Sequence, residues 1–344
     1  MLIAGSAAGT DNTVNQAPDR RQFNPVPHEG AEGLFRQSWY ALCRSADVPL
    51  GGVVGRSFLD GRVAIFRGVD GRVQVVSAYC PHIGADLGLG TVAGNSLRCA
   101  FHQWEFGRDG RCQRTGIGDP APAVARLFNF PTLEKFGIVW AFNGEQPLFD
   151  LVGPSRPWDH LLLDVADSFQ LATDPWVICC NTPDWAHFAT VHRFDFPREG
   201  QNESLTFEAF GVRRKFVARL EHGAGPEISF EVTVRGTNLV LIEGVTQGKW
   251  FAVAACLGVP AAGKCDFFVV TMVDHTAESS QAAAAALLAE YVGIANRMGA
   301  EDSPIWDTMH FKPGALTKSD RALARYLEQL RSFPRAHPSA DFIN

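Results

Sequence analysis

Two short segments each place a cysteine close to a histidine, and they constrain the fold of this 344-residue chain more than any other feature. Cys80 and His82 are spaced as CxH, and Cys99 and His102 follow after sixteen residues as CxxH. Each segment offers one thiolate and one imidazole, so the two segments must meet if all four side chains bind one centre. A [2Fe-2S] cluster with cysteines on one iron and histidines on the other needs this donor set. We predict that these four residues hold such a cluster.

A structural zinc ion is the alternative occupant, because two cysteines and two histidines also complete a tetrahedral site. Zinc sites usually pair Cys with Cys and His with His at short spacing, whereas each segment here carries one of each. Pro81 stiffens the first segment, and turns are supplied by Gly84, Gly88, Gly90 and Gly94. The arrangement favours the two-iron cluster, which indicates that the chain takes part in electron transfer.

The first part of the chain has the pattern of an all-β domain. Residues 1–34 are small, polar and interrupted by proline, which predicts a flexible arm. From Trp39 to Phe142 short β-branched and aromatic runs alternate with turns, and Asp-Gly pairs at 70–71 and 109–110 are typical of hairpins. We predict an N-terminal all-β domain over residues 35–150, with the cluster loops at its tip.

The second part combines strands with helices. Runs between Leu205 and Asp274 alternate partly between apolar and polar residues, as in a half-buried antiparallel sheet. One helix is predicted from a cap at about Ser279 to Arg297, and another from near Ser319 to Arg331. With 46% hydrophobic residues the chain can bury two cores. Residues 151–344 are therefore predicted to form an α+β domain with an antiparallel, helix-grip-like sheet.

Charge and composition argue against several classes of partner. The net charge is −6 without a long basic run, so we expect no nucleic acid. No window reaches the roughly 18 apolar residues of a membrane span, and the N-terminus lacks a signal-peptide pattern. Six further cysteines show no framework spacing, so we expect reduced thiols and a cytoplasmic protein; they are Cys43, Cys112, Cys179, Cys180, Cys256 and Cys265.

A second metal site is suggested by NTPDWAHFATVHRF, in which Asp184, His187 and His192 follow DxxHxxxxH. Pro183 suits the first turn of a helix, with Thr182 or Asn181 as its cap. On an ideal helix the two histidines point about 140° apart, so they meet at one metal only if the helix bulges or breaks before His192.

The alternative for this segment is one solvent-facing histidine and one capping histidine. A cluster in the same chain favours a metal site instead, because delivered electrons need an acceptor. Two histidines and one carboxylate form the open facial site of non-haem Fe(II) oxygenases. His187 and His192 are therefore candidate ligands of a mononuclear iron.

Together these motifs resemble the catalytic subunit of the Rieske non-haem iron oxygenases from Trp39 to about Phe333. Respiratory Rieske proteins carry an extra cysteine in each loop, where this chain has Ala85 and Phe101. The resemblance implies that His187 and His192 bind the iron and that Asp184 bridges it to the cluster of a neighbouring subunit in a homotrimer. It also implies electrons from NAD(P)H through a ferredoxin and/or flavin reductase.

The third ligand of the family is an aspartate near the C-terminus. The segment EDSPIWDTMHFKPGALTKSDRALARYLEQL resembles the 3-ketosteroid 9α-hydroxylase and cholesterol-desaturase group, in which an Asp precedes an Ile-Trp pair. That selects Asp302, with Glu301 and Asp307 as competitors. Three neighbouring tryptophans are predicted to pack rather than to relay electrons: Trp104, Trp185 and Trp306. Cys179 and Cys180 are predicted to be small buried apolar residues rather than ligands.

The resemblance implies O2-dependent hydroxylation or desaturation of a hydrophobic, ring-containing and steroid-like substrate. The 25 phenylalanines agree with an apolar pocket. An aromatic or heteroaromatic monooxygenase, a demethylase and an N-oxygenase are alternatives that use the same two metals. A Rieske electron carrier, in which the second part is only a docking module, is the alternative of a different class.

Overall fold

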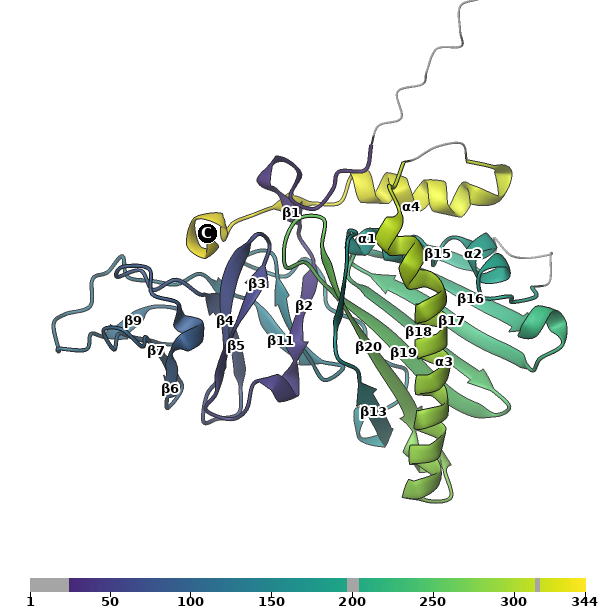
Figure 1. Cartoon of the computed structure of the whole chain (residues 1–344), viewed down its shortest axis with the longest axis horizontal. Coiled ribbons are helices and arrows are strands. Elements are labelled where there is room, and N and C mark those ends of the chain that lie inside the picture. Colours follow the sequence, from purple (N-terminus) through teal and green to yellow (C-terminus); the bar gives the residue numbers. More distant parts are fainter. Residues whose placement is uncertain (1–24, 197–203, 313–315) are drawn as a thin grey trace, which may run out of the picture.

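The computed structural model describes residues 25–196, 204–312 and 316–344. Three antiparallel sheets of three or four strands lie on one side of the molecule and one large antiparallel sheet lies on the other (Figure 1). A further two-stranded sheet joins segments near the two ends of the described chain. The predicted class, an all-β N-terminal part followed by an α+β part with an antiparallel sheet, is confirmed. None of the described helices is both long and apolar enough to cross a bilayer.

The N-terminal β part is built from short strands joined by tight turns. Gly71 and Gly110 have φ of 81° and 77°, so the predicted Asp-Gly hairpin turns are present. The first sheet contains β3 (Val53–Phe58), β4 (Gly61–Arg67), β5 (Val73–Ser77) and β10 (Asn129–Phe130). The second contains β2 (Trp39–Arg44), β11 (Thr132–Lys135) and β12 (Ile138–Phe142), and the third β6 (Thr91–Ala93), β7 (Ser96–Arg98), β8 (Glu105–Phe106) and β9 (Cys112–Arg114).

The large sheet follows the order β13-β20-β19-β18-β17-β16-β15, and β14 also pairs with β20. The strands over 211–219 and 227–235 alternate buried residues with more exposed ones, because one face packs on a core. The strands over 249–258 and 265–274 have no exposed residue, because they contribute side chains to two cores. Its strands are β13 (Leu161–Val165), β14 (Phe169–Leu171), β15 (Leu205–Glu208), β16 (Gly211–Arg219), β17 (Glu227–Arg235), β18 (Leu239–Thr246), β19 (Lys249–Gly258) and β20 (Cys265–Asp274).

Helix α3 (Gln281–Thr308) runs along this sheet (Figure 1). Its cap is Ser280, whose side chain accepts a hydrogen bond from the Ala283 amide, rather than the predicted Ser279. The helix also continues eleven residues beyond the predicted end at Arg297, through Pro304. Tertiary packing explains the extension, because Asp302 and Trp306 are buried against the sheet.

The remaining helices are short. They are α1 (Pro175–Cys179), α2 (Trp185–Thr190), α4 (Arg321–Arg331) and α5 (Ala340–Ile343), with 3₁₀ turns η1 (Ala31–Gly33), η2 (Ser45–Asp47), η3 (Leu87–Leu89), η4 (Trp158–His160), η5 (Glu221–Gly223), η6 (His275–Ala277) and η7 (Lys318–Asp320). Helix α4 was predicted to start near Ser319. It starts after η7, whose cap is Thr317.

The predicted flexible arm is wrong for its last ten residues, while residues 1–24 lie outside the described part. Val26 and Glu29 are buried, and the Glu29 carboxylate pairs with the buried Arg36 guanidinium at 2.8 Å. The C-terminal end also returns to the N-terminal β part. There β21 (Arg335–Ala336) pairs with β1 (Phe35–Arg36), and Ile343 joins the core that contains Phe58.

One apolar core spans both parts of the molecule. It contains Trp39 and Trp140 from β2 and β12, together with Ala254 and Met272 from β19 and β20. Burying large aromatic side chains between two sheets is strongly stabilising. The two parts are therefore held in a fixed relation to each other.

Candidate metal centres

The cluster candidates lie on two similar turns at the outer end of the N-terminal β part. The amide of Cys80 donates to the Ala85 carbonyl at 2.9 Å, and the amide of Gly84 donates to the Cys80 carbonyl at 2.8 Å. In the second turn the Cys99 amide donates to the Trp104 carbonyl at 2.9 Å. These turns bring the two Cys-His segments together although sixteen residues separate them.

The four side chains differ in burial in the way that an asymmetric cluster requires. Cys80 and Cys99 are 3% and 2% exposed, whereas His82 is exposed and His102 is half-buried. The two imidazole rings have centroids 4.6 Å apart, so they form one outer edge. This donor set fits a [2Fe-2S] centre with thiolates inside and histidines outside. Burial raises the pKa of the Cys80 thiol to about 12, so iron must replace its proton before it becomes a ligand.

The helix of the second motif begins two or three residues later than the sequence suggested. Asp184, rather than Thr182 or Asn181, is the cap of α2, and its Oδ1 accepts the His187 amide at 3.2 Å. Pro183 precedes the helix instead of occupying its first turn. Asp184 thus holds the first turn that carries His187.

The helix also breaks before His192, as the spacing of the two histidines required. It ends at Thr190, and Arg193 adopts a left-handed φ of 59°. The break turns His192 back toward His187, so that their ring centroids lie 4.7 Å apart. An unbroken helix would have held the two rings on different faces.

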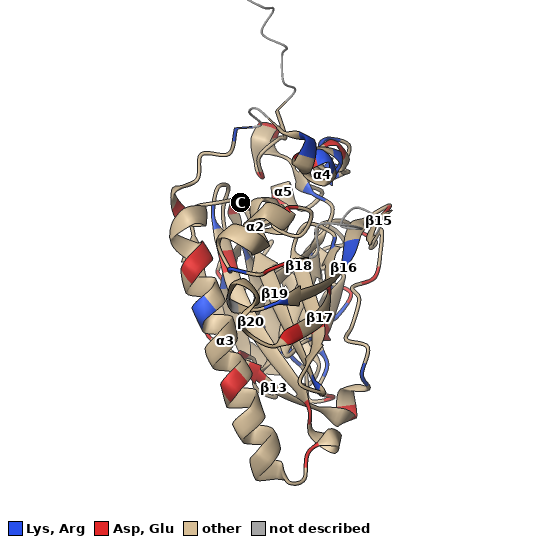
Figure 2. Ribbon diagram, turned by 90° about the vertical axis from the view of Figure 1, so that its right-hand side faces the viewer, with Lys and Arg blue, Asp and Glu red and all other residues tan. Residues whose placement is uncertain are grey.

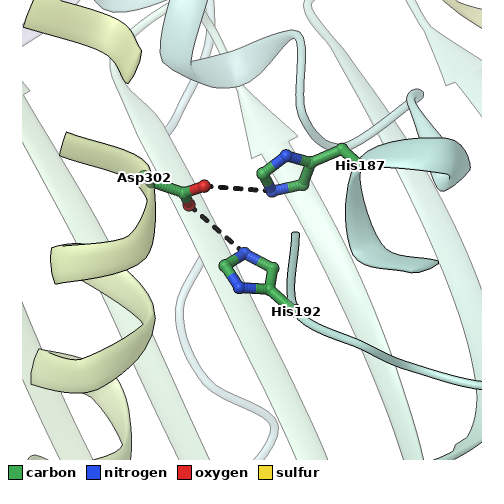
Figure 3. A group of neighbouring side chains, drawn as sticks. All are labelled: His187, His192 and Asp302. Atoms are coloured by element: carbon green, nitrogen blue, oxygen red, sulfur yellow. Dashed lines mark ion pairs between the residues drawn. The ribbon is translucent and has the colours of Figure 1, made fainter. Parts of the chain in front are cut away.

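Asp302 of α3 completes a compact group of three side chains (Figure 3). Its two carboxylate oxygens lie 3.5 Å from His187 Nε2 and 3.3 Å from His192 Nε2. One donor atom from each residue falls within 4.8 Å of the others. Two imidazoles and one carboxylate on one side of a shared point match a facial 2-His-1-carboxylate site.

The two competing carboxylates face other groups. Glu301 Oε2 lies 2.9 Å from His192 Nδ1, the outer ring nitrogen. Asp307 Oδ1 accepts the amide of Ala172 at 2.9 Å and therefore lies outside the group of three. Of the three acidic candidates, only Asp302 faces the Nε2 atoms of both His187 and His192.

The pKa values of the two histidines are shifted in opposite directions. Burial lowers the pKa of His187, and the charge of Asp302 offsets this only in part. Burial also opposes the charged form of His192, but hydrogen bonds and charges from Asp302 and Glu301 outweigh it and raise the pKa of that ring. A metal ion at this point would need both Nε2 atoms unprotonated.

Asn181 is a site residue that the sequence did not identify as such. Its Nδ2 lies 3.0 Å from His187 Nε2, the nitrogen that faces Asp302. The sequence offered it only as a helix cap. The single hint was a polar amide at the end of the buried run 175–180.

A cavity of about 460 Å³ opens beside the three residues. Its walls come from one face of β17 to β20 and from α3, which lies beside these strands in Figure 2. Phenylalanines contribute much of the lining: Phe188, Phe194, Phe230, Phe251 and Phe267. A mostly apolar cavity with a few polar groups at one end is typical of a small-molecule site.

The flanking residues largely pack, as predicted. Trp306 lies against Phe267, and Cys179 and Cys180 are buried with no part in the group of three. Trp104 also contacts a cluster candidate, because its ring stacks on the imidazole of His82 with ring centroids 4.4 Å apart. All eight cysteines lie in the described residues and are free thiols.

Comparison with known proteins identifies one domain and several relatives of the chain. Residues 38–131 match the Rieske [2Fe-2S] domain. Cholesterol 7-desaturase nvd of Bombyx mori is 32% identical over 162 residues, which cover 46% of this chain and 36% of that protein. The oxygenase component of 3-ketosteroid-9-alpha-monooxygenase from Rhodococcus rhodochrous is 26% identical over 218 residues, covering 59% and 52%. The chain thus spans about a third to a half of these relatives.

Solved structures show the fold over a larger share of the chain. NdmA of Pseudomonas putida CBB5 with caffeine has a TM-score of 0.65 at 18% identity, covering 86% of this chain and 90% of that one. Dicamba monooxygenase bound to dicamba has a TM-score of 0.64 at 17% identity, covering 86% and 97%. The predicted [2Fe-2S] cluster agrees with the domain match, and a further structure of dicamba monooxygenase, 16% identical with a TM-score of 0.61, is described with non-heme iron. Residues 38–131 therefore form a Rieske [2Fe-2S] domain, and the chain has the fold of NdmA and dicamba monooxygenase.

Proposed function

We propose that the chain is the oxygenase component of a multicomponent Rieske system that hydroxylates or desaturates a hydrophobic, ring-containing substrate of the steroid type. One observation carries the proposal: His187, His192 and Asp302 converge at one end of an apolar cavity, in a chain that also carries a Rieske domain. In this assignment these three residues bind the mononuclear iron, and Cys80, His82, Cys99 and His102 bind the cluster.

The protein's residues divide the work between binding and positioning. When bound, the cluster supplies single electrons and the iron supplies O2 activation. His187, His192 and Asp302 would hold the iron, and the cavity that they line would receive O2 and substrate. Phe188 and Phe230 exclude water from that side, and the polar side chain of Asn181 can orient a group bound there.

The positions of the two centres support electron transfer between subunits of a homotrimer. In Figure 1 the Rieske end, with β6 to β9, and the iron end, with α2, lie at opposite ends of one chain. Ile83 and Phe101 beside the cluster histidines are each 62% exposed, which suits a surface covered by another protein. We propose that Asp184 of a neighbouring subunit faces this edge, and that a ferredoxin and/or flavin reductase delivers electrons from NAD(P)H.

The shape of the cavity supports an elongated substrate. Both Asp302 and Tyr291 of α3 line it, and eleven residues of helix correspond to about 16 Å. That length suits a fused-ring skeleton with one end at the iron. The names of two relatives, a cholesterol 7-desaturase and a 3-ketosteroid-9-alpha-monooxygenase, also favour a substrate of the steroid type.

Smaller aromatic and heteroaromatic substrates form the second candidate, which includes monooxygenation, demethylation and N-oxygenation. It is favoured by the solved structures of the same fold that hold caffeine and dicamba. The electron carrier of a different class is opposed by the converging second site. A cytoplasmic location completes the proposal and rests on the six cysteines outside the cluster segments, which form no disulfides in the described structure.

The test has two stages. Iron analysis of the reconstituted full chain should give about three iron atoms per chain, whereas a carrier would give about two.

The chain is then supplied with NADH, ferredoxin and its reductase, and a panel of sterols, aromatics and arylamines. We expect a sterol product that has gained one oxygen atom or lost two hydrogens. Asp302→Ala should keep the cluster spectrum and form no product. Products from arylamines alone would overturn the steroid assignment.

A further inference from the structure

We propose that Glu301 is a positioning residue that fixes the tautomer and orientation of His192 and thereby strengthens divalent-metal binding at the mononuclear centre. The inference rests on the proposed function, because it takes His192 as a metal ligand. It adds a role to a carboxylate that the sequence offered only as a competing ligand.

The two ring nitrogens of His192 face different carboxylates. Nδ1 lies 2.9 Å from Glu301 Oε2, and Nε2 lies 3.3 Å from Asp302 Oδ2. A carboxylate can only accept, so Nδ1 donates its hydrogen to Glu301. The neutral ring must then carry its lone pair on Nε2, the nitrogen that faces the converging group.

Glu301 is itself held in place. Adjacent positions on α3 carry Glu301 and Asp302, so one helical turn fixes both the inner and the outer partner of His192. The other oxygen of Glu301 lies 3.7 Å from the guanidinium of Arg193. The His192 side chain is only 3% exposed, so little water competes for its outer nitrogen. The ring is thus clamped between consecutive carboxylates.

His187 depends on a different kind of neighbour. Its Nε2 lies 3.0 Å from the neutral amide of Asn181 and 3.5 Å from Asp302. Asp184 meets the backbone amide of His187 rather than its ring in the contacts described. Removing Glu301 should therefore weaken the hold on His192 and leave His187 in place.

The experiment measures metal affinity without relying on turnover. The mononuclear metal is removed from the full chain with its cluster intact, and Co(II) is titrated in against a competing chelator. Glu301→Ala should bind Co(II) about 10- to 100-fold more weakly than the parent, as is typical for loss of an outer partner. Glu301→Gln keeps an accepting oxygen without the charge, so it should recover part of this loss. The ligand-field spectrum of bound Co(II) should change in Glu301→Ala.

Two controls separate the possible failures. Glu290→Ala removes an exposed carboxylate from the same helix and should leave Co(II) affinity at the parent value. The cluster absorption spectrum of each variant reports whether the chain is folded. If the parent binds Co(II) tightly and folded Glu301→Ala binds it equally well, the role of Glu301 is refuted while the metal centre stands. If the parent with intact cluster binds no Co(II), the metal centre and the proposed function both fail.

Discussion

Asp184 combines a local structural role with the proposed role in electron transfer. Its carboxylate caps α2 through the His187 amide, so it also orients the first histidine. Asparagine is an equally good cap, since its side-chain oxygen accepts the same hydrogen bond. An Asp184→Asn exchange therefore removes the charge and leaves the helix start intact.

We expect Asp184→Asn to retain both metals and to lose most product formation. Iron and sulfide analysis and product yield per NADH consumed would measure the two effects. Asp307→Asn, which changes a carboxylate of α3 outside the group of three, should keep parental turnover. Normal turnover of Asp184→Asn would refute the bridging role.

The pH dependence of metal binding follows from His192. Burial disfavours the charged form of this ring, but the hydrogen bonds and negative charges of Asp302 and Glu301 outweigh burial and raise the pKa of His192. Metal binding must expel this proton, so Co(II) affinity should fall as pH drops through the raised pKa of His192. Because Glu301→Gln removes one negative charge, it should shift that fall to lower pH. Co(II) titrations between pH 6 and about 8 would detect the shift, and identical profiles would contradict it.

At the scale of secondary-structure elements, α3 contributes most to the candidate iron site and its cavity. It supplies Asp302 and Glu301, and it forms one wall of the cavity. Its start is fixed by Ser280, whose Oγ lies 3.1 Å from the Ala283 amide. Ser279, the neighbour that the sequence favoured, makes no such contact among the described hydrogen bonds.

Ser280→Ala should destabilise the chain by about 1 kcal/mol, the usual cost of losing a side-chain cap. Ser279→Ala is the matched control and should change stability by less. Denaturation midpoints of the cluster-containing proteins, followed by far-ultraviolet circular dichroism, would compare the two. An equal shift in both variants would argue against the cap at Ser280.

At the scale of the whole molecule, the core shared by the two parts bears on the proposed path of electrons. Trp39 and Trp140 from one part and Met272 from the other are packed in one cluster, which holds the Rieske end away from the iron end. A chain held in this way supports transfer to a neighbour rather than within itself.

Complementation tests this directly. A His102→Ala chain lacks a competent cluster, and an Asp302→Ala chain lacks a competent iron site. Each should be inactive alone, and co-expressed mixed oligomers should regain part of the parental product formation. If mixed oligomers form and stay inactive, transfer between subunits is wrong. Size-exclusion chromatography with light scattering would establish that they form.

Local spacing alone was enough to predict three features: the pairing of the two Cys-His segments, the Asp-Gly hairpins and the pair of histidines in the second motif. These features depend on residues close together in the chain, where spacing and turn chemistry act directly. The same spacing required a break before His192, and the structure has it. Fold class followed from the change in periodicity between the two parts.

Only the tertiary structure decided which acidic residue faces the histidines. His192 and Glu301 are 109 positions apart, and the orientation of α3 alone turns Asp302 inward and Glu301 to the outer nitrogen. The packing of residues 25–34 and the contact of Asn181 with His187 are of the same kind. Such contacts depend on how distant elements bury their apolar faces, and no local pattern encodes that geometry.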